Sequence, residues 1–176
     1  MRRLLLLRHA KAEPGGPDQD DHDRALTERG LADAAAMARY LKAKAYLPDR
    51  ILCSTSTRTR QTAAPVLRQV PAPIVYVETL YHAPPGRILA LAQDADDAHH
   101  VLLVIGHNPG LEQIAAMLAR DPVKPREQSR HDVMEEKFPT AALAVLDFDI
   151  AHWKQVSPCG GRLVDFVRPR DLDQGR

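Results

Sequence analysis

Residues 3–12 read RLLLLRHAKA, and this stretch decides the fold. Four consecutive leucines predict a strand that is buried on both faces, as in a parallel sheet covered by helices. In such a sheet the carboxyl ends of the strands open on the crevice where ligands bind. Arg8 and His9 follow the leucines directly, so they indicate a nucleophile placed beside a side chain that can hold an anion.

Composition predicts one soluble domain without a broad charged surface. The chain has 176 residues, of which 44% are hydrophobic and 27% charged, and its net charge is +1. These values are ordinary for a globular domain with a sizeable core, and they give no reason to expect a nucleic-acid partner. Cys53 and Cys159 lie far apart without metal-type spacing, which suits a reducing compartment better than a disulfide framework.

The apolar N-terminus is not expected to be a signal peptide or a membrane anchor. Four leucines are too few for the apolar core of a signal peptide, and no small-residue cleavage site follows them. No other apolar segment reaches the length that crosses a bilayer. We therefore expect a cytoplasmic protein with no membrane partner.

Strand-like and helix-like segments alternate along the chain. Strands are predicted at residues 3–7, 50–53, 74–77, 101–105, 141–148 and 162–167, with a further short strand near Gln155. Helices are predicted at residues 27–46, 56–69, 86–97 and 111–120. This alternation predicts an α/β fold, a three-layer α/β/α sandwich around a mostly parallel, mixed sheet of about six strands.

Three local features refine this picture. Gly30 lowers the helix propensity of the first predicted helix, which indicates that another segment packs closely there. Residues 122–138 are polar and contain two prolines, so we expect a mobile insertion within a single domain that covers residues 1–168. Residues 169–176 are expected to form a frayed C-terminal tail.

Polar side chains that can carry chemistry follow three of the predicted strands. Arg8 and His9 follow the first strand, residues 54–58 follow the second, and His107 follows the strand at 101–105. The carboxyl ends of parallel strands share one edge of the sheet, so these groups converge if their strands are neighbours.

Five segments in fixed order carry a family resemblance: RHA at 8–10, DRALTERG at 23–30, STSTRTRQTA at 54–63, GHNP at 106–109 and FPTAA at 138–142. Together they resemble the motifs of the histidine phosphatase superfamily, which is named for an Arg-His-Gly motif. The chain is most similar to the compact SixA-type phosphohistidine phosphatases, and the resemblance covers nearly its whole length. Ala10 stands where the superfamily has glycine.

The resemblance implies a phosphoryl-transfer site. His9 would attack phosphorus through a neutral ring nitrogen and form a phosphohistidine, while its other nitrogen binds a partner, which we expect to be a backbone carbonyl. Arg8, Arg58 and His107 would bind the phosphoryl oxygens, with His107 contributing most when a bound phosphate favours its protonated form. These cations would take the role that Mg²⁺ has elsewhere, so we expect neither a metal nor a cofactor.

The proton donor for the leaving group is the least defined part of the site. Many members of the superfamily have a glutamate after the third strand, whereas residues 78–83 here read ETLYHA. His82 is the candidate donor, with Glu78 as the second choice. An imidazole leaves from phosphohistidine more readily than an alkoxide leaves from an ester, so a weak acid favours phosphohistidine as the substrate.

The predicted function is a metal-independent phosphatase that acts on phosphohistidine in a protein. A phosphorylated protein or a small phosphorylated metabolite would be its partner, and inorganic phosphate or a similar oxyanion would bind between Arg8 and Arg58. A small-molecule phosphomonoesterase acting on sugar or nucleotide phosphates is the alternative enzyme. A module that only binds phosphorylated ligands is the competing class, although a pure binder needs no nucleophile.

Several polar residues also allow simpler interpretations. His22 and its acidic neighbours at 20–23 are expected to form a solvated acidic loop. Lys11 either adds positive potential to the site or points to solvent. Ser54 lacks the Gly-x-Ser-x-Gly context of a nucleophile, so we expect it to cap a helix or to contact phosphate.

Overall fold

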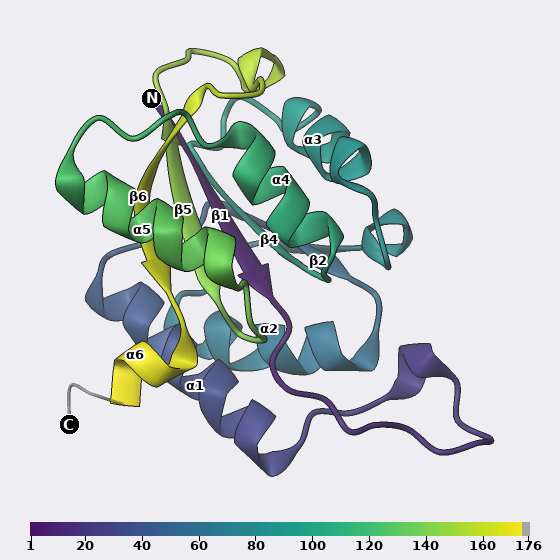
Figure 1. Cartoon of the computed structure of the whole chain (residues 1–176). Helices are drawn as coiled ribbons and strands as arrows, with labels where there is room; N and C mark the ends of the chain where they lie inside the picture. Colours follow the sequence, from purple (N-terminus) through teal and green to yellow (C-terminus); the bar gives the residue numbers. More distant parts are fainter. Residues whose placement is uncertain (174–176) are drawn as a thin grey trace.

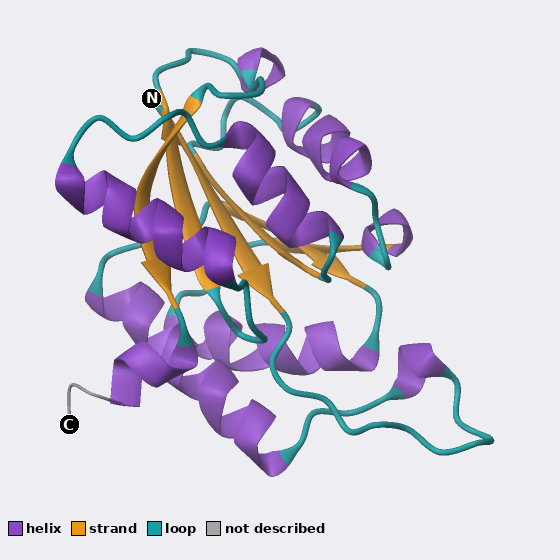
Figure 2. Ribbon diagram, viewed as in Figure 1, coloured by secondary structure: helices purple, strands orange, loops and turns teal. Residues whose placement is uncertain are grey.

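A six-stranded sheet lies between two layers of helices in the computed structural model, which describes residues 1–173 (Figures 1 and 2). The strands are β1 (Arg2–Arg8), β2 (Arg50–Ser54), β3 (Ile74–Val77), β4 (Val101–Gly106), β5 (Leu143–Phe148) and β6 (Gly161–Val167). The helices are α1 (Glu28–Ala43), α2 (Thr57–Gln69), α3 (Pro85–Gln93), α4 (Gly110–Leu118), α5 (Pro125–Glu136) and α6 (Pro169–Asp173). Short 3-10 helices are η1 (Asp21–Asp23), η2 (Glu78–Leu80) and η3 (Trp153–Gln155). No described helix is long and apolar enough to cross a membrane.

The strand order is β3-β2-β4-β1-β5-β6, and it puts β1 at the centre. The first four of these strands run parallel, whereas β5 pairs antiparallel with both β1 and β6. The predicted mixed sheet in a three-layer α/β/α sandwich is therefore confirmed. Because β2 and β1 are the two neighbours of β4, the residues that follow these three strands reach the same edge of the sheet.

The four leucines of β1 are completely buried and divide between the two faces of the sheet. Leu4 and Leu6 pack in the core formed with α3, α4 and α5, while Leu5 and Leu7 pack in the core formed with α1 and α2. Burying each leucine side chain contributes roughly 1.5–3 kcal/mol. The edge that carries Arg8 and His9 is thus attached to a strand whose four central side chains are completely buried.

Gly30 marks a close approach, as predicted. A Cβ atom added at Gly30 would lie 2.1 Å from the carbonyl oxygen of Lys11. The same carbonyl accepts a hydrogen bond from the backbone N–H of Thr27 (2.9 Å), and the Thr27 side chain caps α1. The start of α1 therefore fixes the backbone that follows His9.

The segment expected to be a mobile insertion, residues 122–138, contains helix α5. Glu127, His131 and Met134 form the buried face of this helix, which packs against β6. Two of these three inward side chains are polar, which hid the apolar periodicity from the sequence. The Glu127 carboxylate is satisfied by the backbone N–H of Val123 (2.9 Å).

Four local predictions need correction. The predicted tail contains α6, which begins where Asp171 accepts a hydrogen bond from the backbone N–H of Arg168 (2.8 Å); residues 174–176 lie outside the described part. The segment near Gln155 is the 3-10 helix η3 and not a strand. α1 ends at Ala43 and not at residue 46, because Ala45 adopts a φ of 55°. α3 ends at Gln93, before residue 97.

Candidate active site

His9 stands at the carboxyl end of β1 with its ring orientation fixed. Its side chain is almost fully buried, and Nδ1 lies 2.7 Å from the carbonyl oxygen of Ala10. A carbonyl can only accept a hydrogen bond, so Nδ1 carries the proton. In the neutral ring Nε2 then holds the free lone pair. The expected backbone carbonyl partner is confirmed and is that of Ala10.

Three separate segments hold the backbone around His9. The N–H of His9 donates to the carbonyl of Gly106 at the end of β4 (3.0 Å), and its own carbonyl accepts from the N–H of Ala141 (2.9 Å). The N–H of Ala10 donates to Oγ1 of Thr62 in α2 (3.0 Å). The position of the imidazole therefore depends on the central sheet and on α2 together.

His107 follows β4 and faces His9. The two ring centroids are 5.2 Å apart, and His107 is only 3% exposed. Its Nε2 lies 2.7 Å from Oγ of Ser54 at the end of β2. Ser54 thus positions a histidine; it is Ser56 that caps α2, which corrects the expected capping role of Ser54.

Two arginines supply further donors, of which Arg58 is buried and Arg8 half-buried. Arg58, in the first turn of α2, is 2% exposed and donates from Nη1 to the Asp21 carbonyl (2.8 Å) and from Nη2 to the Asp21 carboxylate (3.1 Å). Arg8 donates from Nη1 to the Phe138 carbonyl (3.0 Å). Among the described residues, Nε of Arg8, Nε of Arg58 and Nδ1 of His107 are buried without a hydrogen-bond partner. Buried polar atoms of this kind favour an oxyanion that would satisfy them.

Burial and positive neighbours keep both histidines neutral. Desolvation, followed by the charges of Arg58 and Arg8, lowers the pKa of His9 to about 4. Desolvation, followed by the influence of His9 and Arg58, lowers the pKa of His107 to about 2. A neutral His9 is the form that can act as a nucleophile. A bound anion would oppose these shifts and favour protonation of His107.

Asp21, Tyr81 and His82 contact one another next to Arg58, and we call these three residues the arch. The Tyr81 hydroxyl donates to the Asp21 carboxylate, and the ring of His82 stacks on Tyr81 with a centroid distance of 4.1 Å. Nε2 of His82 lies 3.3 Å from Nη2 of Arg58 and 3.5 Å from Oδ2 of Asp21. His82, the predicted proton donor, therefore reaches the site, and its side chain is 55% exposed.

The α4 side of the site anchors this arch. Gly110 starts α4, and a Cβ atom added to it would lie 1.9 Å from the carbonyl oxygen of Ala83, the residue after His82. His82 itself adopts a φ of 50°. The close approach at Gly110 thus fixes the chain at the point where it turns His82 toward the pocket.

Asp21 and Tyr81 were missed by the sequence analysis. The acidic residues at 20–23 were expected to be a solvated loop, but η1 packs against α2 and places Asp21 on Arg58. His22 likewise binds Oγ1 of Thr55 through Nε2 (2.8 Å). Hydrogen bonds from Tyr81 and then Arg24, together with the charge of Arg58, hold the pKa of Asp21 well below its usual range. No periodicity links Asp21 to Arg58, which is 37 residues away.

The predicted residues meet in one pocket of about 300 Å³. It is lined by Arg8, His9, Lys11, Ala12, Arg24, Arg58, His82, His107, Asn108 and Thr140. Lys11 lines this pocket and is also exposed to solvent, so both of its interpretations stay open. Glu78, the second choice for the proton donor, is exposed in η2 and does not line it. Within residues 1–173, no group of three or more His, Cys, Asp and Glu is arranged to hold a metal ion.

Comparisons with known proteins place the chain in a family. The family model described as "Histidine phosphatase superfamily (branch 1)" matches residues 4–100. An uncharacterized protein from Mycobacterium tuberculosis is 39% identical over 165 residues, which are 93% of this chain and 100% of that protein. Two solved structures are similar over 96% of this chain. A proposed phosphohistidine phosphatase SixA from Agrobacterium tumefaciens is 35% identical over 98% of its length, with a TM-score of 0.76. One from Nakamurella multipartitia is 30% identical over 96% of its length, with a TM-score of 0.82.

The chain belongs to the histidine phosphatase superfamily. Within that superfamily it is of the SixA type, as the likeness to two SixA structures over almost the entire chain shows. It is accordingly an enzyme, a hydrolase that acts as a phosphatase.

Proposed function

We propose that the protein removes the phosphoryl group from phosphohistidine in a protein substrate, with His9 as the nucleophile. Nε2 of His9 attacks phosphorus, and the P–N bond to the substrate imidazole breaks as the new P–N bond forms. The electron pair stays on the substrate imidazole, which takes up a proton. Water then attacks the phosphorylated His9, releases inorganic phosphate and restores the neutral ring.

The buried cations stabilise the charge that the transferring group carries on its oxygens. Arg8 and Arg58 present fixed guanidinium donors beside His9, and a planar guanidinium can bind two oxygens at once. His107 becomes a stronger donor when the anion raises its pKa toward the ordinary value. Such preorganised donors in a buried pocket lower the barrier to phosphoryl transfer. A SixA protein histidine phosphatase of the same fold, 23% identical with a TM-score of 0.76, is complexed with the oxyanion tungstate.

The lack of a protonated carboxylic acid near the pocket favours phosphohistidine over an ester as the substrate. No carboxylic acid lines the pocket within the described residues, and the adjoining Asp21 is held in its ionised form. The proton donor is then His82, a weaker acid than a protonated glutamate. An imidazole leaving group tolerates this, and transfer from one histidine to another is nearly balanced in energy. An alkoxide leaving group requires a stronger acid.

The test compares leaving groups on the same enzyme. A peptide carrying phosphohistidine and an unactivated alkyl phosphate are assayed for phosphate release by the wild type and by His9→Ala. We expect kcat/KM for the phosphohistidine peptide to exceed that for the alkyl phosphate by on the order of 100-fold or more, with both activities lost in His9→Ala. Equal turnover of the two substrates would instead support a small-molecule phosphomonoesterase.

A further inference from the structure

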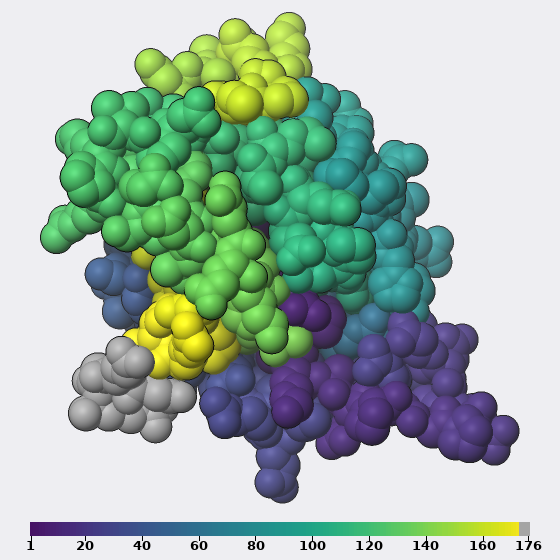
Figure 3. All heavy atoms as spheres, in the orientation of Figure 1, coloured from purple at the N-terminus to yellow at the C-terminus, as the bar shows by residue number. Residues whose placement is uncertain are grey.

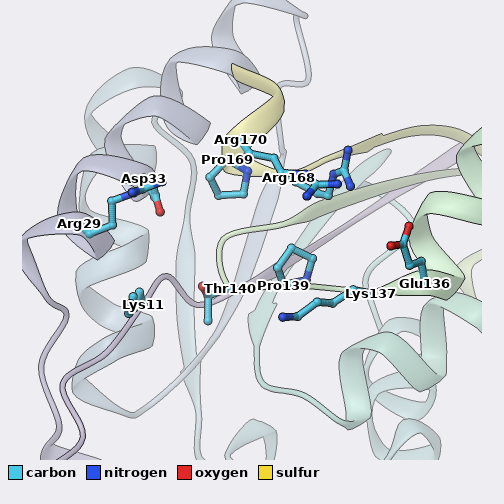
Figure 4. Close-up of a pocket in the computed structure, with 10 residues that line it drawn as sticks. All are labelled: Lys11, Arg29, Asp33, Glu136, Lys137, Pro139, Thr140, Arg168, Pro169 and Arg170. Atoms are coloured by element: carbon cyan, nitrogen blue, oxygen red, sulfur yellow. Dashed lines mark hydrogen bonds and ion pairs between the residues drawn. The ribbon is translucent and has the colours of Figure 1, made fainter. Parts of the chain in front are cut away.

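A second pocket, of about 370 Å³, adjoins the site of phosphoryl transfer. Figure 4 shows that four segments build it. They are Lys11 after β1, Arg29 and Asp33 on α1, the end of α5 with the residues beyond it (Glu136, Lys137, Pro139 and Thr140), and residues 168–170 at α6. The purple, green and yellow segments also meet on the face of the molecule that Figure 3 shows. Helix α6, which the sequence analysis treated as a frayed tail, supplies one wall.

Half of the residues that line this pocket are cationic. It contains five cations and two carboxylates: Lys11, Arg29, Lys137, Arg168 and Arg170, with Asp33 and Glu136. Arg168 is neutralised by Asp171 (2.8 Å), and Arg29 lies 3.4 Å from Asp33. Lys11, Lys137 and Arg170 are exposed, and in the part of the chain that the structure describes no carboxylate forms an ion pair with them. The pocket therefore has positive charge available for a ligand.

The two pockets share part of their lining. Lys11 and Thr140 line both of them. The carbonyl of Phe138 accepts hydrogen bonds from Nη1 of Arg8 (3.0 Å) and Nδ2 of Asn108 (2.9 Å), which anchors the segment between the pockets to the active site. On the other side, the close contact at Gly30 holds the backbone of Lys11. A substrate whose phosphoryl group lies at His9 would extend over Thr140 into the second pocket.

We propose that the second pocket binds a carboxylate side chain of the substrate protein, close in its sequence to the phosphorylated residue. This inference rests on the proposed function and adds a preference for acidic sequence around the phosphohistidine. The available cations stand on separate segments and are interspersed with Asp33 and Glu136, unlike the compact set of buried donors around His9. Dispersed single charges suit carboxylates along a peptide better than a second phosphate, whose charge is concentrated at one point.

The experiment uses phosphohistidine peptides in matched pairs that carry Glu or Gln at the positions flanking the phosphohistidine. Wild type is compared with Lys137→Glu, with Arg170→Glu and with the double variant; these residues line only the second pocket. Lys154→Glu is the control, because this exposed lysine lies in η3, which contacts the loop before β4 at the other end of the sheet. Each peptide is measured both as a substrate and as an inhibitor of p-nitrophenyl phosphate hydrolysis.

For the wild type we expect the Glu peptide to be preferred about fivefold in kcat/KM or in inhibition, with a smaller preference at high salt. Lys137→Glu and Arg170→Glu should abolish or reverse that preference while p-nitrophenyl phosphate hydrolysis stays unchanged, and Lys154→Glu should keep it. Equal values for the two peptides with wild type, or a preference that survives the double variant, would overturn the inference. Peptides that inhibit but are not hydrolysed would contradict the proposed substrate class. The second pocket would then be tested by whether the Glu peptide inhibits more strongly than the Gln peptide.

A small phosphorylated metabolite that carries its own carboxylate tests whether the second pocket serves a metabolite instead of a protein. 3-Phosphoglycerate and glycerol phosphate are assayed with the same variants. We expect Lys137→Glu and Arg170→Glu to change the turnover of the two compounds equally. A selective loss for 3-phosphoglycerate, with no change for the peptides, would assign the pocket to small metabolites and overturn the proposal.

Discussion

The buried groups around His9 and the exposed arch over them differ in how firmly the fold holds them. His9, Arg58 and His107 are 8%, 2% and 3% exposed. The two histidines directly follow strands β1 and β4, and Arg58 lies in the first turn of α2. The side chains of Asp21 and His82 are 44% and 55% exposed and come from short loops and 3-10 helices. In the proposed mechanism, the fold thus fixes the donors that meet the phosphoryl oxygens and leaves the side where the leaving group departs open to solvent. Substitutions should therefore affect the two regions in different ways.

Removing the nucleophile is the strongest test of the buried region. His9→Ala should lower kcat for every phosphorylated substrate by on the order of 1,000-fold or more, because it removes the Nε2 lone pair that attacks phosphorus in the proposed mechanism. The measurement is phosphate release from p-nitrophenyl phosphate. His152→Ala, an exposed histidine paired with Asp97, is the matched control and should retain full activity. Comparable rates in wild type and His9→Ala would refute the assignment.

Arg58→Lys tests whether the geometry of the buried donors matters as well as their charge. The substitution keeps a positive charge but removes the planar fork, so kcat/KM should fall by on the order of 100-fold. Arg60→Lys is the matched control, because Arg60 is exposed beside the ring of Tyr76 and outside the pocket. A loss below about threefold in Arg58→Lys would mean that Arg58 acts only through its charge.

The arch should matter for some substrates and not for others. If His82 supplies the proton, His82→Gln should reduce turnover of an alkyl phosphate by about tenfold and that of p-nitrophenyl phosphate by less than about twofold, because nitrophenolate leaves without help. Steady-state kinetics on both substrates gives this ratio directly. An equal loss on both would show that His82 positions Arg58 and does not donate a proton.

The two neutral histidines also make stability depend on pH. The pKa of His9 is about 4 and that of His107 about 2, against about 6.5 in an unfolded chain. As the pH falls from about 6.5 toward 4, the unfolded chain binds protons that the folded chain does not bind, so the free energy of unfolding decreases. Each histidine contributes about 1.4 kcal/mol per pH unit to this slope. Urea denaturation between pH 7 and pH 4.5 should give a shallower slope for His9→Gln and His107→Gln than for wild type; identical slopes would contradict the shifts.

The sequence predicted the buried region better than the arch, for physical reasons. Leu4–Leu7 are a local pattern that fixes a central strand, and residues that end parallel strands meet at one edge, so Arg8, His9, Arg58 and His107 could be found from the chain alone. Asp21 and Tyr81 meet Arg58 through tertiary packing of loops, which leaves no periodic signal. Helix α5 was missed because Glu127 and His131 are polar residues on its buried face. The second pocket depends on α6 and on the segment after α5, both of which the sequence analysis had set aside.

The central claim is that Nε2 of His9 carries the phosphoryl group during turnover. Rapid quenching at alkaline pH, which preserves phosphohistidine, followed by mass spectrometry of the digested protein, tests it most directly. We expect a transient phosphoryl group on Nε2 of His9, because the Nδ1 proton is committed to the Ala10 carbonyl, and no such group in His9→Ala. Phosphorylation at another residue, phosphorylation on Nδ1, or rapid turnover without any phosphorylated His9 would contradict the mechanism.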